Sequence, residues 1–356
     1  MKRYLLFFGL LGLVWACDPE EPEEPNPGPE ENPDYVFNTP SYFPPLNQPS
    51  DNIATERGVE LGRYLFFETQ LSADNSMSCA NCHLQSSGFS DPNATSVGID
   101  GIAGTRNAMA IINLTYRVNG LFWDGRAPTL EIQAEEPIPN PIEMHQEWPD
   151  ALDKLRNDAI YPPIFEDAFG DTAITVDRVT KAIAQFERTL ISGNSKFDKF
   201  LRGEVQLTPE EIRGFDTFEN ETSDCFHCHG AYATAFQFTD NAFHNNGLDS
   251  IWPPADKGRF DITANPADMG LFMTPTLRNI ELTGPYMHDG RFETLEEVIE
   301  FYNMGGHPSP TIDPNMKAAG VGRNWTPQQK ADLIAFLKTL TDPDFINNPD
   351  HSNPHE

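Results

Sequence analysis

Two short segments place cysteine and histidine at a spacing that can hold a metal cofactor. Residues 79–83 read C-A-N-C-H and residues 225–229 read C-F-H-C-H. Both have the form C-x-x-C-H, which is the attachment pattern of a c-type haem. The two thiols can form thioethers to one porphyrin, and the adjacent histidine can supply an axial nitrogen to its iron. The two copies use four of the five cysteines of the chain. The sequence therefore predicts two covalently bound haem c groups.

Other uses of paired cysteines fit less well. A structural zinc site closes four ligands on one metal, which would leave His83 and His229 unexplained. A thioredoxin-like redox pair is set in a βαβ unit, and neither flank shows one. His227 lies between the two cysteines of the second segment and is expected to be a spacer rather than a ligand.

The first residues have the form of an export signal. Lys2 and Arg3 precede an apolar run that ends near residue 15, and residues 1–16 are too short for a mature membrane span. Cys17 follows Ala16, as in a bacterial lipoprotein, so we expect Cys17 to be lipidated. The alternative is an ordinary signal peptide followed by an incidental cysteine. Either kind of signal sequence would place the protein on the periplasmic side or the cell surface of a bacterial envelope.

Charge and composition divide the rest of the chain. Over 356 residues the formal net charge is −30, which argues against nucleic acid and favours a basic or neutral partner. Residues 17–36 hold Cys17 and a run rich in proline and glutamate, which is expected to be an extended tether. We expect a first haem domain over residues 37–201, a second over residues 202–345, and a tail over residues 346–356.

Helical patterns flank both haem segments. Apolar residues recur at helical spacing over residues 56–67 and 177–201. Thr208, Pro209 and Glu211 form a capping box at the start of a further helix, and Thr326 begins a last one. A capped helix before each C-x-x-C-H suggests two copies of one unit. The predicted fold is mainly α, with two cytochrome c-like domains packed face to face.

Two further blocks carry a resemblance to a known family. Residues 122–127 read F-W-D-G-R-A, and residues 274–279 read T-P-T-L-R-N, followed by P-Y-M-H-D-G at 285–290. With the two haem segments, these blocks resemble the bacterial diheme cytochrome c peroxidase family. That family includes the methylamine-utilisation diheme enzyme, which oxidises a protein tryptophan. The resemblance covers about residues 40–342.

The resemblance implies roles for residues near the first haem. Trp123 would lie between the two haems and assist electron transfer, whereas without the resemblance it would be a core aromatic residue. Glu143 would be the distal acid that moves a proton during cleavage of the peroxide O–O bond. The alternative for Glu143 is a solvated charge in a proline-rich loop. Gln133 would also belong to this pocket.

One departure from the family pattern concerns the first iron. The best-known members carry a histidine some sixteen residues after the first haem histidine, and it caps that iron at rest. Here no histidine occurs between His83 and His145. We therefore expect the His83 haem to be open to peroxide without prior reduction. His145 is the only nearby histidine that could take the place of this capping ligand. The alternative is that His145 is an ordinary histidine in a loop.

The second haem requires a sixth ligand. Met316 matches the family's ligand segment in register and is favoured, with Met304 as the runner-up. Met287, Met273 or an open iron remain as alternatives. A thioether ligand raises the reduction potential, which suits a haem that receives electrons. The methylamine-utilisation enzyme has a tyrosine as this ligand, so a methionine favours the peroxidase branch.

By resemblance, a calcium ion would lie between the domains. Its ligands would be the Asn107 side chain and the carbonyl oxygens of Thr283 and Pro285, which with water form the all-oxygen shell that Ca²⁺ prefers. His288 would lie near the second haem and this ion.

The predicted function is a diheme c-type peroxidase that reduces hydrogen peroxide to water. Electrons would come from a small redox protein such as a cytochrome c or a cupredoxin. One alternative is a diheme oxidase of a protein or organic substrate that uses peroxide as its oxidant. The other is a diheme electron carrier without catalytic activity. A homodimer is expected by resemblance alone.

Overall fold

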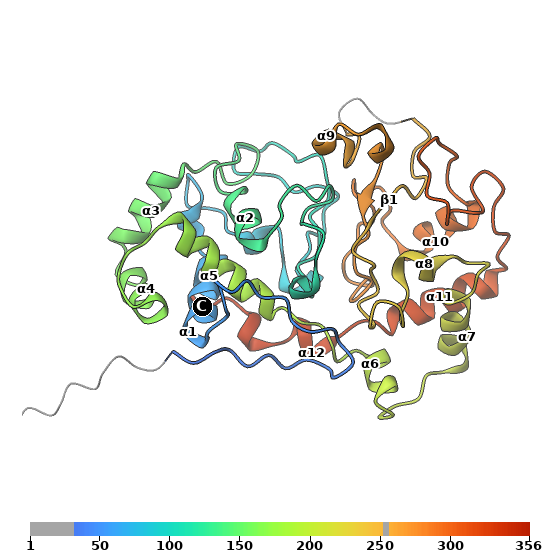
Figure 1. The fold of residues 1–356 in the computed structure, drawn as a ribbon, viewed down its shortest axis with the longest axis horizontal. Coiled ribbons are helices and arrows are strands. Elements are labelled where there is room, and N and C mark those ends of the chain that lie inside the picture. The colour runs from blue at the N-terminus through green and yellow to red at the C-terminus, as the bar shows by residue number, and fades with distance from the viewer. Residues whose placement is uncertain (1–31, 252–255) are drawn as a thin grey trace, which may run out of the picture. The chain divides into compact units, whose positions relative to one another are not determined.

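Helices dominate the part of the chain that the computed structural model describes, residues 32–251 and 256–356 (Figure 1). The export signal, Cys17 and most of the tether lie outside the described residues. The α-helices are α1 (Glu56–Phe66), α2 (Leu130–Glu135), α3 (Trp148–Asn157), α4 (Tyr161–Phe169), α5 (Val176–Thr189), α6 (Lys196–Leu201), α7 (Pro209–Phe218), α8 (Cys225–His229), α9 (Phe260–Thr263), α10 (Leu295–Met304), α11 (Pro327–Lys338) and α12 (Pro343–Ile346). Two short strands, β1 (Phe243–His244) and β2 (Phe272–Met273), pair antiparallel. The mainly α fold is confirmed.

The first half is built on the packing of α1 against α5. At Gly62 of α1, an added Cβ would collide with the backbone carbonyl of Ala182 in α5, so only glycine permits this approach. Leu61, Leu65 and Ile183 lie in the core beside this crossing. The first haem segment follows α1 after a loop and begins with the short 3-10 helix Cys79–Asn81.

The second half repeats this arrangement. An added Cβ at Gly214 of α7 would collide with the backbone carbonyl of Asp332 in α11. Phe336 of α11 packs with Phe218 of α7 at a ring separation of 5.2 Å. The second haem segment forms α8 directly after α7. Each half therefore sets one C-x-x-C-H segment beside a glycine-mediated helix crossing, as expected for two copies of one unit.

The predicted helix starts are confirmed at both caps in the second half. The Thr208 side chain accepts a hydrogen bond from the Glu211 backbone N–H, and Glu211 completes the capping box. The Thr326 side chain accepts in the same way from Gln329. These bonds satisfy N–H groups that would otherwise lack partners in the first helical turn.

The helical pattern over residues 177–201 is not one helix. α5 ends at Thr189, and α6 begins at Lys196 with Ser195 as its N-cap. The Ser195 side chain accepts from the Asp198 N–H, and the Asp198 carboxylate accepts from the Ser195 N–H and Oγ–H. This local capping box begins a new helix where apolar spacing alone predicted continuation.

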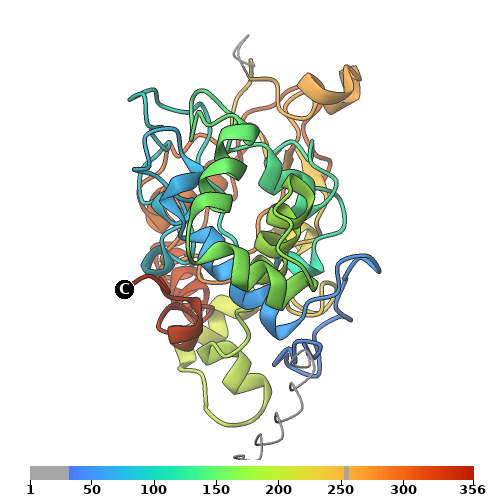
Figure 2. The same cartoon turned by 90° about the vertical axis from the view of Figure 1, so that its left-hand side faces the viewer.

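The C-terminal segment returns to the first half. Residues 32–356 form one compact unit, and the red segment after α12 lies beside the blue α1 (Figures 1 and 2). The Arg63 Nε–H donates to the Ser352 carbonyl oxygen at 2.7 Å. The rings of Phe345 and His351 lie 5.5 and 6.1 Å from that of Phe89. Residues 346–356, expected to be a tail, are thus anchored on the first half.

Within the described ranges, none of the helices combines the length and apolar character needed to cross a membrane.

A buried ion pair connects distant segments of the chain. The Arg278 guanidinium and the Asp198 carboxylate are fully buried, with nitrogen–oxygen distances of 2.9 and 3.0 Å in a two-pronged arrangement. The Tyr42 hydroxyl donates to the same carboxylate at 2.7 Å. Arg278 also lies over the Phe43 ring at 4.6 Å. Burial would raise the pKa of Asp198, but Arg278, Ser195 and Tyr42 together outweigh burial and hold that pKa low.

Replacing Arg278 with methionine should therefore lower the free energy of unfolding by about 3–5 kcal/mol, because the Asp198 charge would lose its partner in the interior. Urea denaturation of the haem-loaded protein measures this loss. Arg202→Gln is the matched control, since Arg202 pairs with Glu204 at the surface and its loss should cost less than about 1 kcal/mol. Equal losses for the two variants would contradict a stabilising role for the buried pair.

Candidate haem sites

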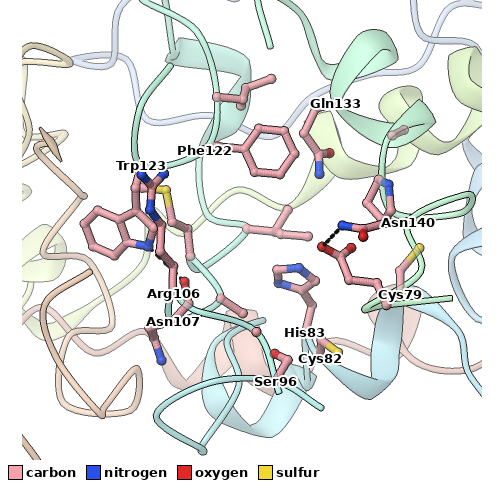
Figure 3. A pocket seen from close by; sticks show the side chains of 18 of the residues that line it. Cys79, Cys82, His83, Ser96, Arg106, Asn107, Phe122, Trp123, Gln133 and Asn140 are labelled. Atoms are coloured by element: carbon pink, nitrogen blue, oxygen red, sulfur yellow. Dashed lines mark hydrogen bonds between the residues drawn. The ribbon is translucent and has the colours of Figure 1, made fainter. Parts of the chain in front are cut away.

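The first C-x-x-C-H segment lines a large cavity of the described structure. Its volume is about 480 Å³, and Cys79, Cys82 and His83 contribute to its wall. In Figure 3, His83 and Gln133 point toward the same space, and Trp123 lies on the opposite side from Cys79. The four cysteines of the two segments form no disulfide with one another. They are therefore available for thioether attachment.

Each haem histidine is oriented by a backbone carbonyl. His83 Nδ1 lies 3.0 Å from the Phe89 carbonyl oxygen, and His229 Nδ1 lies 2.9 Å from that of Phe238. This hydrogen bond leaves Nε2 free to bind iron. Burial lowers the pKa of both imidazoles, which favours the neutral form that a metal binds.

The same backbone conformation presents the carbonyl that orients each histidine. Phe89 and Phe238 are fully buried, and both have positive φ, at 57° and 54°. This conformation is uncommon for residues other than glycine. Its occurrence at the carbonyl that orients the ligand in both halves is consistent with two copies of one unit.

The three residues predicted to be catalytic line the first cavity. Trp123, Gln133 and Glu143 all line it together with His83. The Asn140 Nδ2–H donates to the Glu143 carboxylate at 2.8 Å, as the dashed line in Figure 3 shows. Burial raises the pKa of Glu143, although Arg126 opposes the shift. The raised pKa makes this carboxyl group easier to protonate, which suits a group that takes up and returns a proton.

The structure places His145 away from this cavity. Its side chain is half exposed and pairs with Asp100 at 2.6 Å. Among the described residues, His83 is the one histidine that lines the first cavity. The geometry thus offers no second histidine to cap the iron.

The second segment lines a cavity of about 220 Å³. Cys225, Cys228 and His229 lie in its wall. Met316 lines it as well, and so do the alternatives Met287 and Met273. The predicted ligand Met316 therefore belongs to the same cavity as the iron-binding histidine.

The runner-up Met304 is not supported. Its side chain is 60% exposed and lines neither cavity. Consecutive residues of an α-helix are turned by about 100°, so Met304 and Tyr302 of α10 lie on opposite faces. It is Tyr302 that lines the second cavity.

Tyr302 is a candidate ligand that the sequence analysis missed. Its phenol oxygen accepts a hydrogen bond from Asn246 Nδ2 at 3.2 Å. Burial raises the pKa of Tyr302 to about 12. Tyrosine is a known axial ligand of haem iron. The signal was available in the helical register of α10, where the apolar face predicts which of residues 302 and 304 turns inward.

Trp123 and Asn107 form part of a wall that both cavities share. Both residues line both cavities. The Trp123 Nε1–H donates to the Asn107 carbonyl oxygen at 2.8 Å, and the Asn107 N–H donates to that of His288, also at 2.8 Å. The Met273 N–H donates to the Trp123 carbonyl oxygen at 2.8 Å. These three bonds fix Trp123 between the two predicted haem positions.

The residues predicted for calcium converge on the second cavity. Asn107, Thr283 and Pro285 all line it. Asn107 Nδ2 donates to the carbonyl oxygens of Asn93 and Ala94, and within the described ranges no donor contacts its Oδ1. A free amide oxygen suits Ca²⁺.

His288 lines the second cavity as well. It is buried and stacks on Phe272 at 3.6 Å with an interplanar angle of 12°. Its ring lies 6.5 Å from that of Trp123. Burial lowers its pKa, so it is an uncharged neighbour of the second cavity.

Comparisons with known proteins agree with this geometry. The family model described as di-haem cytochrome c peroxidase matches residues 56–206. A methylamine utilization protein MauG from Methylorubrum extorquens is 36% identical over 306 residues, which cover 85% of this chain and 83% of the relative. A cytochrome c551 peroxidase from Nitrosomonas europaea is 36% identical over 311 residues, covering 84% of this chain and 87% of the relative.

A solved structure is similar throughout. The crystal structure of a MauG-like protein associated with microbial copper homeostasis aligns with a TM-score of 0.83 at 36% identity. The alignment covers 90% of this chain and 100% of that protein. These similarities over most of the chain, together with two cavities that each hold a C-x-x-C-H segment, show that this protein belongs to the di-haem cytochrome c peroxidase family and is an oxidoreductase with two haem c groups and peroxide as its oxidant.

Proposed function

We propose that the fully oxidised protein reduces hydrogen peroxide at the His83 haem without prior reduction. The observation that carries this proposal is the composition of the first cavity, which holds Glu143 and Gln133 and, among the described residues, no histidine besides His83. Haem bound here supplies the iron that accepts peroxide and the redox couple that reduces it.

Glu143 is the proton carrier in this proposal. Its carboxyl group lines the cavity and is held by Asn140 at 2.8 Å. It takes a proton from the iron-proximal oxygen of peroxide and returns it to the distal oxygen, so that water can leave. The Gln133 amide lines the same cavity and can orient the peroxide by hydrogen bonding.

Trp123 is the proposed route for electrons between the two sites. It lines both cavities and is fixed by its bond to Asn107. Electrons would enter at the His229 site from a small redox protein such as a cytochrome c or a cupredoxin. The net charge of −30 favours a donor with a basic docking surface.

Met316 would bind the second iron together with His229, and Tyr302 is the alternative. Both side chains line the cavity of His229. A methionine thioether favours an electron-entry haem of high potential. A tyrosine is the ligand type of the methylamine-utilisation branch, so Tyr302 favours the alternative function, an oxidase of a protein or organic substrate.

Three further features complete the proposal. Asn107, Thr283 and Pro285 would hold one Ca²⁺ at the wall between the sites, as their convergence suggests. Cys17 would carry a lipid that anchors the protein to the extracytoplasmic side of a bacterial membrane. A homodimer is expected by resemblance to the family.

The test is peroxide consumption by the fully oxidised, haem-loaded protein supplied with Ca²⁺ and a reduced small cytochrome c. We expect turnover from the first seconds without a lag. A lag that disappears after reduction of one haem would show that a ligand caps the first iron and would contradict the proposal. Absence of turnover in both regimes would favour the oxidase or the electron carrier.

Replacing Glu143 with glutamine should lower kcat for peroxide at least about 100-fold, because the amide cannot accept and return a proton. In the unmodified protein, activity should rise with pH through the pKa of Glu143, which burial places above the usual carboxyl range. This acid limb should be absent in Glu143→Gln. A variant that keeps both the rate and the limb would exclude Glu143 as the proton carrier.

The two ligand candidates can be separated by spectroscopy of the oxidised protein. If Met316 is the ligand, Met316→Leu abolishes the sulfur-to-iron charge-transfer band of a low-spin His/Met haem, and Tyr302→Phe leaves it intact. If Tyr302 is the ligand, that band is absent from the unmodified protein and Tyr302→Phe alters the low-spin signal. A low-spin signal that survives both replacements would rule out both residues.

A further inference from the structure

Arg117 is a charged side chain at the wall between the two haem cavities, and it has no partner among the described residues. It follows the short 3-10 helix Leu114–Tyr116 and lines both cavities. It also lines a third, smaller cavity of about 70 Å³. Within residues 32–251 and 256–356, its guanidinium makes no ion pair and no hydrogen bond.

Such a position is unfavourable for a cation. Burial is the one cause that lowers the pKa of Arg117, to about 10, and no carboxylate opposes it. The group is therefore still charged at neutral pH. A buried charge is costly unless it is paired and hydrogen-bonded. Arg117 is thus expected to have a partner of opposite charge that the described part of the polypeptide does not supply.

The acidic side chains around the cavities are occupied elsewhere. Asp124 and Asp256 in the first cavity both pair with Arg106. In the second cavity, Asp224 pairs with Arg323, and Asp313 pairs with His244.

The remaining acids of the first cavity do not pair with Arg117 either. Glu143 is held by Asn140. Glu187 is buried, and burial raises its pKa to about 8, so its carboxyl group is largely protonated at neutral pH.

Haem c carries two propionate carboxylates at one edge of the porphyrin. Arginine binds carboxylates through two parallel N–H donors more specifically than lysine does. We propose that Arg117 binds a haem propionate at the wall between the two cavities, and that this contact raises the reduction potential of the haem it binds. The inference rests on the two haems of the family and not on peroxide turnover.

The small third cavity supports this assignment. Arg188 lies in its wall with Arg117, and its side chain is only 3% exposed. Arg188 Nη2 pairs with Glu131 at 2.7 Å, whereas its Nη1 is buried and has no partner among the described residues. Two guanidinium groups with unused donors thus border one small space that shares Arg117 with the haem cavities, so a second positive charge lies near the position proposed for the propionate.

The test compares Arg117→Gln, Arg117→Lys and a remote control in the haem-loaded protein. Arg178→Gln is the control, because it removes one positive charge from a surface pair with Asp171. The readouts are the midpoint potentials of both haems in a redox titration and the propionate bending bands in the resonance Raman spectrum. Peroxide turnover is not among these readouts, so failure of the proposed function would not affect the result.

We expect Arg117→Gln to lower the potential of the bound haem and to shift its propionate bands. Loss of a nearby positive charge stabilises the ferric state, which explains the direction. Arg117→Lys keeps the charge but not the paired donors, so it should shift the bands with a smaller change in potential. Arg178→Gln should leave both readouts unchanged. Unchanged bands in Arg117→Gln would overturn the proposal, whether or not the potentials move.

If Arg117→Gln does not retain haem, a crystal structure of the unmodified haem-loaded protein decides the question. The proposal requires an Arg117 nitrogen at about 2.7–3.2 Å from a propionate oxygen. A guanidinium directed away from both haems would overturn it.

Discussion

The hydrogen bond from Trp123 Nε1–H to the Asn107 carbonyl oxygen fixes the wall on which the two sites depend. The residues on either side of this bond line both cavities. Asn107 is held in turn by the backbone of His288, and Trp123 by that of Met273. Segments from both halves of the chain are therefore hydrogen-bonded to one another at the wall that the two cavities share. Rigid placement matters here, because displacing a catalytic or relay group by a small distance lowers rates steeply.

The two halves share a plan and differ in what surrounds the iron. In each, a buried phenylalanine in a left-handed backbone conformation presents the carbonyl that orients the haem histidine. The first cavity then adds Glu143 and Gln133, and the second adds Met316 and Tyr302. One site is thus suited to proton-coupled chemistry on a small oxidant, and the other to holding a six-coordinate iron. The asymmetry resides in the side chains opposite each histidine.

Much of the site could be predicted from the sequence, because its chemistry depends on local spacing. The C-x-x-C-H segments, the capping boxes at Thr208 and Thr326, and the mainly α fold are all encoded within a few residues. Two local signals were not used: the Ser195 capping box, which begins a new helix, and the register of α10, which turns Tyr302 rather than Met304 inward. What depends on distant contacts could not be predicted in this way, as for residues 346–356, which are anchored by contacts with α1 nearly 290 positions away. Arg117 belongs to no sequence motif, and only the three-dimensional arrangement reveals that it has no partner among the described residues.

The central claim is that the two irons differ at rest, with the first open and the second capped. Electron paramagnetic resonance of the fully oxidised, haem-loaded protein tests it most directly, because high-spin and low-spin ferric haems give separate signals that can be counted. The account predicts one high-spin haem, which is lost on replacement of His83, and one low-spin haem per chain. Two low-spin haems in equal amounts would show that a ligand caps the first iron at rest and would contradict the account.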